Sequence, residues 1–296
     1  MPLSITICSW NTIDDTRACL QSLRESGTEA EFEVIVVDNN SEDGSPEMIA
    51  TEFPEFTLLA QSRNLGFTGG HNLALKHASG EHKALLNSDT VVHPGAVGTI
   101  LEFMATHPEA GVVGPKLLNP DGTLQYSCRR FPNPVAAAFR NTLLGKLFPN
   151  NRYTKDYLMQ DWGHSEPREV DWVSGAALFI RGDCLQAIGP LDDSLFMFCE
   201  DVDWCKRAWN AGFKVMYCPQ AVITHAIGRS TDKAPNRMIA RFHRSMFRYY
   251  KKHNVREAPA VARPFLLAFA ACALSARASI FLVKNKVDVL RRKIRR

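Results

Sequence analysis

The chain has 296 residues, of which 45% are hydrophobic and 22% charged, close to the globular average, which excludes a disordered or fibrous protein. Its 18 glycines and 16 prolines are ordinary and exclude a collagen-like repeat. The eight cysteines form no Cys-x-x-Cys pair and no zinc-binding spacing, so we expect free thiols and a reducing compartment. Residues 3–8 resemble a strand and carry no basic, apolar secretion signal, which favours a cytoplasmic protein.

Charge is distributed unevenly along the chain. Residues 227–296 carry 18 lysines and arginines against 3 acidic residues, a net charge of +15, whereas residues 1–226 carry 17 against 28, a net charge of −11. A basic segment of this kind attracts phosphate, either in nucleic acid or on an anionic lipid surface. We therefore expect two parts with different partners.

Short apolar runs alternate with helix-like stretches at the start of the chain. Strands are predicted at residues 4–8, 33–37, 57–60 and 83–86, and helices at 15–25, 46–52 and 70–78. This alternation is typical of a parallel sheet with right-handed crossovers. Ligands of such sheets bind beyond the carboxyl ends of the strands. The residues that follow the four strands include Asn11, Asp38, Arg63, Asn64, Gly66, Asn87, Ser88 and Asp89.

The pattern weakens in the middle of the chain. Residues 111–162, with scattered Pro, Asn and Arg, are compatible with a lid or with an insertion that faces a second substrate. Residues 171–180 predict a buried strand, and residues 201–211 predict a helix that ends at Gly212. Residues 215–218 predict a short strand closed by Pro219.

The end of the chain predicts two helices separated by Pro259 and Pro264. In the second, apolar residues recur every three or four positions and Arg277 lies among the charges on the other side, as in a helix lying in a membrane surface. A transmembrane span over residues 265–283 is the alternative, in which Arg277 costs roughly 2–3 kcal/mol. A helix packed on the protein's own core is the third interpretation.

Three acidic residues and one histidine are candidates for chemistry. Asp89 follows a buried strand, where a carboxylate suits a hard divalent cation, although an Asp there is also a common turn former. Glu200 and Asp201 follow the aromatic run 196–198 at the start of a helix, where burial and like charge raise a carboxyl pKa toward that of a useful base. His225 follows a strand-like stretch, and imidazole is a common metal ligand.

Six segments follow one another between residues 4 and 253: VVDNNSEDGS, RNLGFTGGHN, LLNSDT, DWVSGAALFIRGD, GPLDDSLFMFCEDVDWCKRAWNAG and THAIGRS. Together they resemble family 2 of the inverting glycosyltransferases, and more narrowly its bacterial rhamnosyltransferase-like branch. The resemblance implies a GT-A fold: an α/β, Rossmann-like, mostly parallel sheet flanked by helices. We expect a transferase domain over residues 1–235, with the nucleotide-sugar half at about 1–110 and the acceptor half at about 111–235. A basic, amphipathic helical extension, residues 236–296, is expected to associate with a membrane.

The resemblance also implies roles for single residues. Asp201 corresponds to the catalytic base, and Asp89 and His225 correspond to ligands of Mg²⁺ or Mn²⁺. Asn87 stands where the family has the first acid of its D-x-D motif, which leaves Asp89 as the anionic ligand there. Expected nucleotide-sugar contacts are Asn11, Asp38, Arg63, Asn64, Gly66, Gly70, Asn72, Asn87 and Arg229, and expected acceptor contacts are Trp172 and Glu200.

The implied reaction transfers L-rhamnose from dTDP-rhamnose to a polyprenyl-diphosphate-linked glycan, at the cytoplasmic face of the bacterial inner membrane, in cell-surface polysaccharide synthesis. UDP-galactofuranose, UDP-GlcNAc and UDP-glucose are the alternative donors. The alternative class is a non-catalytic nucleic-acid-binding or scaffold protein, against which the acidic main body argues, so we expect no nucleic-acid partner. A nucleotidyltransferase would need a Gly-rich basic loop near the N-terminus, which ICSWNT does not supply.

Overall fold

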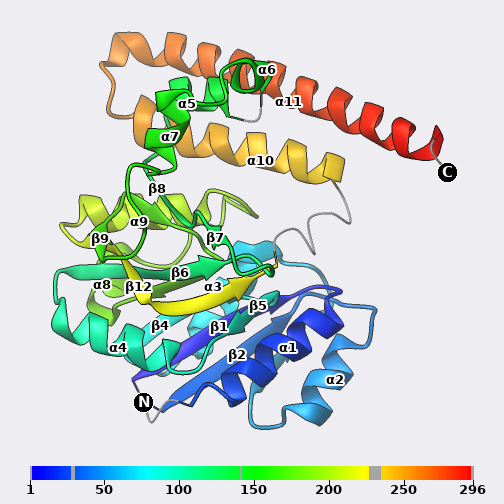
Figure 1. Ribbon diagram of the computed structural model, residues 1–296, viewed down its shortest axis with the longest axis vertical. Coiled ribbons are helices and arrows are strands. Elements are labelled where there is room, and N and C mark those ends of the chain that lie inside the picture. Colours follow the sequence, from blue (N-terminus) through cyan, green and yellow to red (C-terminus); the bar gives the residue numbers. More distant parts are fainter. Residues whose placement is uncertain (1, 28–30, 141, 227–234, 295–296) are drawn as a thin grey trace.

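Ten strands form one mixed sheet in the part of the chain that the computed structural model describes, residues 2–27, 31–140, 142–226 and 235–294. The strand order is β3-β2-β1-β4-β11-β6-β12-β5, with β7 beside β6 and β9 beside β12. Helices lie on both sides of this sheet, and two long C-terminal helices lie beyond its upper edge (Figure 1). The expected GT-A-like arrangement of a mostly parallel sheet with a helical extension is therefore present.

Strands and helices alternate in the first half of the sheet, from β1 to β4, as the sequence predicted. Its strands, all parallel, are β1 (Leu3–Ser9), β2 (Phe32–Asp38), β3 (Thr57–Ala60) and β4 (His82–Asn87). Its helices are α1 (Ile13–Arg24), α2 (Ser45–Glu52) and α3 (Gly66–His77). The predicted strands and the first two helices are confirmed to within two residues, whereas α3 begins at Gly66 rather than at residue 70.

Both faces of the sheet are covered in this half. Val34 and Val36 of β2 pack in the core cluster that contains the buried residues of α1 and α2. Ile35 and Val37, which point to the other face, pack with Ala74 of α3. Because a parallel sheet covered on both faces leaves its strand ends open, the carboxyl edge is where a ligand is expected.

The second half adds antiparallel strands to the sheet. Its elements are β5 (Thr90–Val92), α4 (Ala96–Thr106), β6 (Ala110–Leu118), β7 (Leu124–Gln125), β9 (Arg168–Glu169), β11 (Ala177–Ile180), α8 (Gly182–Ile188), α9 (Glu200–Asn210) and β12 (Lys214–His225). Strand β11 pairs antiparallel with both β4 and β6, whereas β12 runs parallel to β6. The predicted helix at 201–211 is confirmed as α9.

Two strand predictions are wrong in this half. Residues 171–180 are not one strand, because the chain turns at residues 174–176. β10 (Trp172–Val173) pairs with β8 (Cys128–Arg129) in a separate two-stranded sheet, and β11 begins after the turn. Pro219 does not close the strand at residues 215–218. β12 continues through it to His225, because a register shift between Cys218 and Val222 takes the proline out of the ladder.

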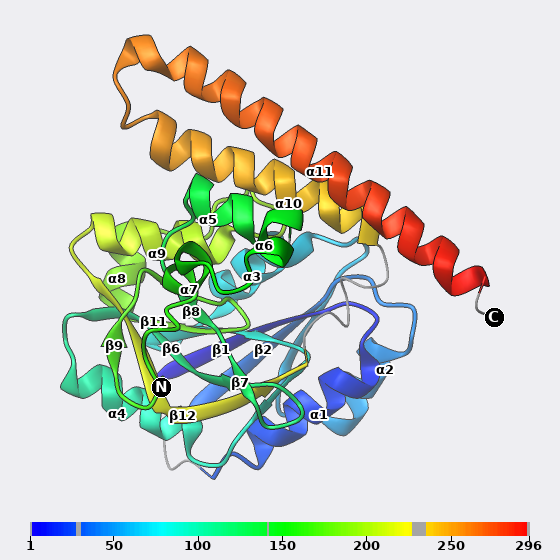
Figure 2. The same ribbon diagram turned by 45° about the horizontal axis from the view of Figure 1, so that its top comes forward.

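Residues 134–157 form three short helices where the sequence has its weakest pattern. They are α5 (Pro134–Phe139), α6 (Leu143–Leu147) and α7 (Arg152–Tyr157). Each is capped by a side chain that accepts a hydrogen bond from a backbone N–H three residues on, namely those of Asn133, Thr142 and Asn151. Helices α5 and α6 lie against the two C-terminal helices (Figures 1 and 2).

The C-terminal extension is a hairpin of two long helices (Figure 2). Helix α10 (Pro235–Tyr250) continues into a π-helical turn (Lys251–Val255, η2), and a 3-10 turn (Ala260–Ala262, η3) leads into α11 (Arg263–Ile294). Pro264 does not separate the two helices as predicted. It lies in the first turn of α11, where a proline costs no hydrogen bond.

Helix α11 exposes an apolar surface. Phe265, Phe269, Ile280 and Val283 are each 60–77% exposed. The stretch Ala260–Val287 is long and apolar enough to cross a membrane, and only 6% of its most apolar window is buried in the protein. A helix packed throughout on the protein's own core is thereby excluded.

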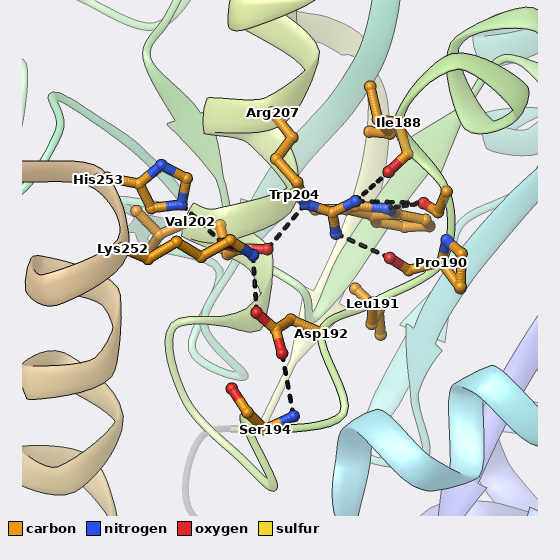
Figure 3. Close-up of polar contacts among 12 residues, drawn as sticks. Ile188, Pro190, Leu191, Asp192, Ser194, Val202, Trp204, Arg207, Lys252 and His253 are labelled. Carbon is orange, nitrogen blue, oxygen red and sulfur yellow. Dashed lines mark hydrogen bonds and ion pairs between the residues drawn. The ribbon is translucent and has the colours of Figure 1, made fainter. Parts of the chain in front are cut away.

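One buried carboxylate, that of Asp203, joins the extension to α9. Figure 3 shows Lys252 and His253 of the extension beside Arg207 of α9. The Asp203 side chain is fully buried and lies 2.7 Å from both His253 Nε2 and Lys252 Nζ, and its Oδ2 accepts a hydrogen bond from Arg207 Nε at 2.8 Å. Burial raises the pKa of Asp203, but the hydrogen bonds from His253 and Lys252 and the charge of Arg207 outweigh it, so that its pKa lies below the ordinary value. Lys252 also binds Asp192, at 2.7 Å.

We expect Asp203→Asn to lower the free energy of unfolding at pH 7 by about 3 kcal/mol, because it removes the buried charge that pairs with Arg207 and Lys252 and leaves Arg207 without an ion pair among the described residues. The pKa of the folded state is below the unfolded value of about 3.9. The stabilisation is therefore complete above that pH and is lost as the pH falls through the folded pKa. Urea unfolding at pH 7 and pH 3 should show a smaller difference between variant and parent at pH 3.

Asp192→Asn is the matched control, because it removes the half-exposed partner of the same lysine. It should cost less than about 1 kcal/mol. Equal losses in the two variants would show that the Asp203 cluster does not hold the extension in place.

Candidate active site

The carboxyl ends of β1, β2 and β4 lie side by side. Ser9 is in register with Asp38, and Cys8 is in register with Asn87. The loops that follow are joined by side chains: the Thr12 and Ser88 hydroxyls lie 3.2 Å apart. Asn11, which follows β1, accepts a hydrogen bond from the backbone of the loop after β2, at Glu42 N, 2.7 Å. The sheet therefore brings Asn11, Asp38 and Asn87 to one edge, as the sequence predicted.

Asp38 has an open acceptor at this edge. Its side chain is buried, and Oδ2 accepts a hydrogen bond from Ser41 N at 2.9 Å. Its Oδ1 is buried without a partner among the described residues. A buried carboxylate oxygen of this kind is suited to a ligand hydroxyl or N–H group.

Of the residues expected at the nucleotide sugar around the start of α3, the two glycines are used in packing and the two polar residues are exposed. Arg63 and Asn64 are exposed, whereas Gly66 and Gly70 are buried. Gly66 has φ +77°, and a Cβ there would lie 2.6 Å from the carbonyl oxygen of Phe196. A Cβ at Gly70 would lie 2.5 Å from Cys8 Sγ. Both glycines thus allow close approach of protein segments, and their expected contact with a nucleotide sugar stays a prediction.

Asn72 fixes the loop that precedes α9. Its amide nitrogen donates to Leu191 O at 2.9 Å and to Asp193 Oδ1 at 2.7 Å, and its amide oxygen accepts from Leu191 N at 3.0 Å. The structure gives this side chain a role in positioning the loop rather than an open position facing a ligand. Arg229, also expected at the nucleotide sugar, lies outside the described residues.

Asp89 and His225 lie together at the same edge. Asp89 Oδ1 and His225 Nε2 are 3.3 Å apart, and Ala226 N donates to Asp89 O at 2.9 Å. Gln125 orients the imidazole: its Oε1 lies 2.7 Å from His225 Nδ1, and its Nε2 donates to the His225 carbonyl at 3.1 Å. Because the Gln125 Oε1 atom can only accept a hydrogen bond, Nδ1 carries the proton of this contact. Nε2, which faces Asp89 and the Asn87 amide, is then the nitrogen that a neutral imidazole would offer to a metal ion.

Asp89 and His225 would offer a divalent cation two ligands. Among the described residues, no group of three or more His, Cys, Asp and Glu side chains is arranged to hold a metal ion. The Asp89–His225 pair supplies one oxygen and one nitrogen ligand, and the Asn87 amide lies 3.2 Å from the same imidazole. Such a site fits a cation that takes its other ligands from water and phosphate oxygens.

Asp201 and Glu200 begin α9 after a strained turn. Phe198 (φ 71°) and Cys199 (φ 68°) are consecutive non-glycine residues in the left-handed region, a conformation that costs free energy and is found at functional sites. Asp201 Oδ2 accepts a hydrogen bond from Gly175 N at 3.0 Å. Asn87, at the end of β4, donates its backbone N–H to the carbonyl of Ala176, the residue after Gly175. The turn at residues 174–176 therefore connects the Asp201 carboxylate to the end of β4.

Both carboxyls have a raised pKa. Burial raises the pKa of Asp201 against the opposing hydrogen bonds from Gly175 and Val202 and the charge of Arg129. Burial and the adjacent Asp201 raise the pKa of Glu200 well above its ordinary value. A carboxyl group with a raised pKa is a stronger base in its ionised form, and a general base must accept a proton.

These two side chains line a cavity of about 500 Å³ between the sheet edge and the extension. Trp172, expected beside the acceptor, lines the same cavity, with its indole N–H donated to Arg130 O at 2.8 Å. The cavity is also lined by residues that sequence reasoning missed, among them Arg129, Arg140, Tyr157 and Arg277. Arg129, Arg140 and Tyr157 lie in the segment without a clear periodicity, and Arg277 lies in the helix that the sequence assigns to a membrane surface. Neither pattern predicts a position in this cavity.

Residues 4–165, more than half of the chain, match the sequence model of glycosyl transferase family 2. The chain belongs to this family. Over 231 residues it is 30% identical to the N-acetylglucosaminyl-diphospho-decaprenol L-rhamnosyltransferase of Mycobacterium tuberculosis, a match that covers 74% of this chain and 75% of that protein. The predicted family and its rhamnosyltransferase-like character are confirmed to that extent.

Two solved structures show the fold of this family 2 glycosyltransferase. The mannosyltransferase PcManGT from Pyrobaculum calidifontis, in complex with GDP-Man and Mn²⁺, has a TM-score of 0.58 at 18% identity and covers 97% of this chain and 80% of its own. S. aureus TarS has a TM-score of 0.57 at 17% identity, and the match covers 92% of this chain but only 43% of TarS. TarS 1–349 is also solved with UDP-GlcNAc, with a TM-score of 0.55. The GT-A prediction is confirmed, whereas the roles of single residues stay predictions.

Proposed function

We propose that this chain is an inverting, metal-dependent glycosyltransferase that adds a sugar to a lipid-linked glycan in bacterial cell-surface polysaccharide synthesis. The observation that carries the proposal is Asp201: a partly buried carboxylate with a raised pKa, which accepts a hydrogen bond from Gly175 N and lines the cavity. The donor we propose is dTDP-L-rhamnose, which the likeness to the decaprenol-linked rhamnosyltransferase supports. UDP-sugars remain the alternative donors.

The reaction is a single displacement. The acceptor hydroxyl oxygen forms a bond to the anomeric carbon of the sugar, and the carbon–oxygen bond to the diphosphate breaks, with the electron pair leaving on the diphosphate. Asp201 takes the hydroxyl proton as the bond forms. Asp89 and His225 would hold a divalent cation, which would supply Lewis-acid stabilisation to the leaving diphosphate. Asp38, with its open Oδ1, binds the nucleoside of the donor.

The helical extension has an exposed apolar surface and a basic charge. We propose that residues 236–296 attach the protein to the cytoplasmic face of the inner membrane as a peripheral protein, with α11 lying in the surface. The exposed apolar side chains of α11 and the basic charge of this segment support the proposal, because each Lys or Arg near an anionic surface contributes about 1 kcal/mol.

Asp201→Asn should lower the rate of sugar transfer by about 10³-fold while the donor dissociation constant changes less than about twofold, because a base acts in the transition state. Single-turnover transfer and donor titration measure the two quantities. Asp183→Asn, at an exposed carboxylate of α8, is the control and should transfer normally. Transfer by Asp201→Asn within a few-fold of the parent would exclude this carboxylate as the base.

Asp89→Asn should weaken metal-dependent donor binding by about tenfold or more, because it removes the anionic ligand of the pair. Thermal shift against dTDP-rhamnose and UDP-sugars, with Mn²⁺ or with EDTA, measures donor choice and metal dependence together. We expect the largest shift with dTDP-rhamnose and Mn²⁺. Equal thermal shifts with Mn²⁺ and with EDTA would contradict the metal role. A larger shift with a UDP-sugar than with dTDP-rhamnose would show that the UDP-sugar is the donor.

Phe265→Glu should reduce binding to anionic vesicles by about tenfold or more, because it removes an exposed apolar side chain of α11 from lipid contact. Val91→Glu alters an exposed apolar residue of β5, outside the extension, and should bind as the parent does. Co-sedimentation measures both. Equal binding by all three proteins would contradict attachment through α11, and resistance of the parent to alkaline carbonate would favour a span over residues 265–283.

A further inference from the structure

Three arginines from separate segments meet in the cavity that contains Asp201. Arg129 lies in β8, Arg140 ends α5, and Arg277 lies midway along α11. The Arg277 guanidinium donates to the Arg140 carbonyl at 3.2 Å, which joins the extension to the middle segment of the chain. The cluster is therefore assembled only where α11 packs against α5.

The positive charges of these arginines are not neutralised in the described part of the chain. None of the three forms an ion pair there, and the Nε atoms of Arg129 and Arg277 are buried without hydrogen-bond partners. Burial and the charge of Arg129 lower the pKa of Arg140. The carboxyls facing the cavity are Glu200 and Asp201, whose ionisation burial opposes. Each guanidinium lies over an aromatic ring, at 4.9–5.2 Å from the centroid, a contact that supplies no counter-charge. Guanidinium groups that have no acidic partner in such a place are typical of an anion site.

An apolar groove of about 530 Å³ adjoins this cluster. It is lined by α5, α6, α10 and α11, and its walls include Leu144, Phe269 and Leu274. Arg277 and Phe281 line both the groove and the cavity of Asp201. A ligand that occupies both spaces must therefore carry an anionic group with a hydrocarbon chain on one side and a polar portion, near Asp201, on the other.

We propose that Arg129, Arg140 and Arg277 bind the diphosphate of a polyprenyl-diphosphate-linked acceptor, with its first isoprenoid units in the groove and its sugar at Asp201. This proposal rests on the proposed function and adds the site that selects the acceptor. The three cations match a diphosphate better than the single phosphate of a membrane phospholipid. The exposed apolar face of α11 would lead the remaining isoprenoid units of the acceptor into the bilayer.

The first test measures binding without catalysis. Farnesyl diphosphate is titrated into the full-length protein by isothermal titration calorimetry, and its binding is compared with that of inorganic diphosphate and of phosphatidylglycerol micelles. We expect the tightest binding for farnesyl diphosphate. Arg140→Gln and Arg277→Gln should each weaken it about tenfold to a hundredfold. Equal binding of phosphatidylglycerol, or no loss in either variant, would overturn the proposal.

Arg263→Gln is the matched control, because it removes the same charge from an exposed position of the same helix. It should bind farnesyl diphosphate within about twofold of the parent. Arg277→Lys keeps the charge if Arg277→Gln disturbs the packing of α11, and should bind more tightly than Arg277→Gln. Losses of equal size in Arg263→Gln and Arg277→Gln would overturn the proposal by showing a general effect of charge.

The second test separates this inference from the proposed function. In transfer assays, Arg140→Gln should raise the KM for a lipid-diphosphate acceptor about tenfold or more, with the donor KM unchanged, and this loss should disappear with a neutral alkyl glycoside acceptor. Absence of transfer by the parent with any donor would refute the proposed function while the binding test still stands. Equal losses with both acceptors would overturn the diphosphate site.

Discussion

The first turn of α9 holds three acidic side chains, Glu200, Asp201 and Asp203, and the structure stabilises the charge of Asp203 while it opposes the charge of Asp201. Asp203 is surrounded by His253, Lys252 and Arg207, so that its charge is stabilised and its pKa is lowered. Asp201, two positions earlier, receives backbone hydrogen bonds that do not offset its burial, and its pKa is raised. Residues two apart point to different sides of a helix. One therefore anchors the extension while the other faces the cavity.

This arrangement makes the extension part of the site. Lys252 and His253, which contact Asp203, lie in η2, between α10 and α11. The cluster that stabilises the fold therefore also fixes the point from which α11 starts back over the cavity. Midway along α11, the hydrogen bond from Arg277 to the Arg140 carbonyl fixes this helix against the segment that follows α5. A segment whose sequence predicts only membrane attachment thus supplies a wall of the space in which transfer is proposed to occur.

The sequence allowed the first half of the fold to be predicted because buried parallel strands are continuous apolar runs. It failed where tertiary contacts decide the backbone. The turn at residues 174–176 follows from hydrogen bonds to Asp201 and Asn87, and Pro219 is tolerated because β12 shifts its register there. The pairing of Asp89 with His225 came from family resemblance, since no spacing relates residues 136 positions apart. Gln125, which orients that histidine, carried no signal at all.

The helical periodicity of α11 was identified correctly, but one residue of its charged side, Arg277, was assigned to the wrong surroundings. The amphipathic pattern placed Arg277 at a water-facing surface, whereas the structure turns it toward Arg140 and leaves Phe265, Phe269 and Ile280 exposed. A cation is costly next to apolar groups unless an anion or hydrogen-bond acceptors compensate it. One carbonyl satisfies part of that need. The charge of Arg277 facing inward and the apolar side chains facing outward fit a surface that receives an anionic lipid from the bilayer.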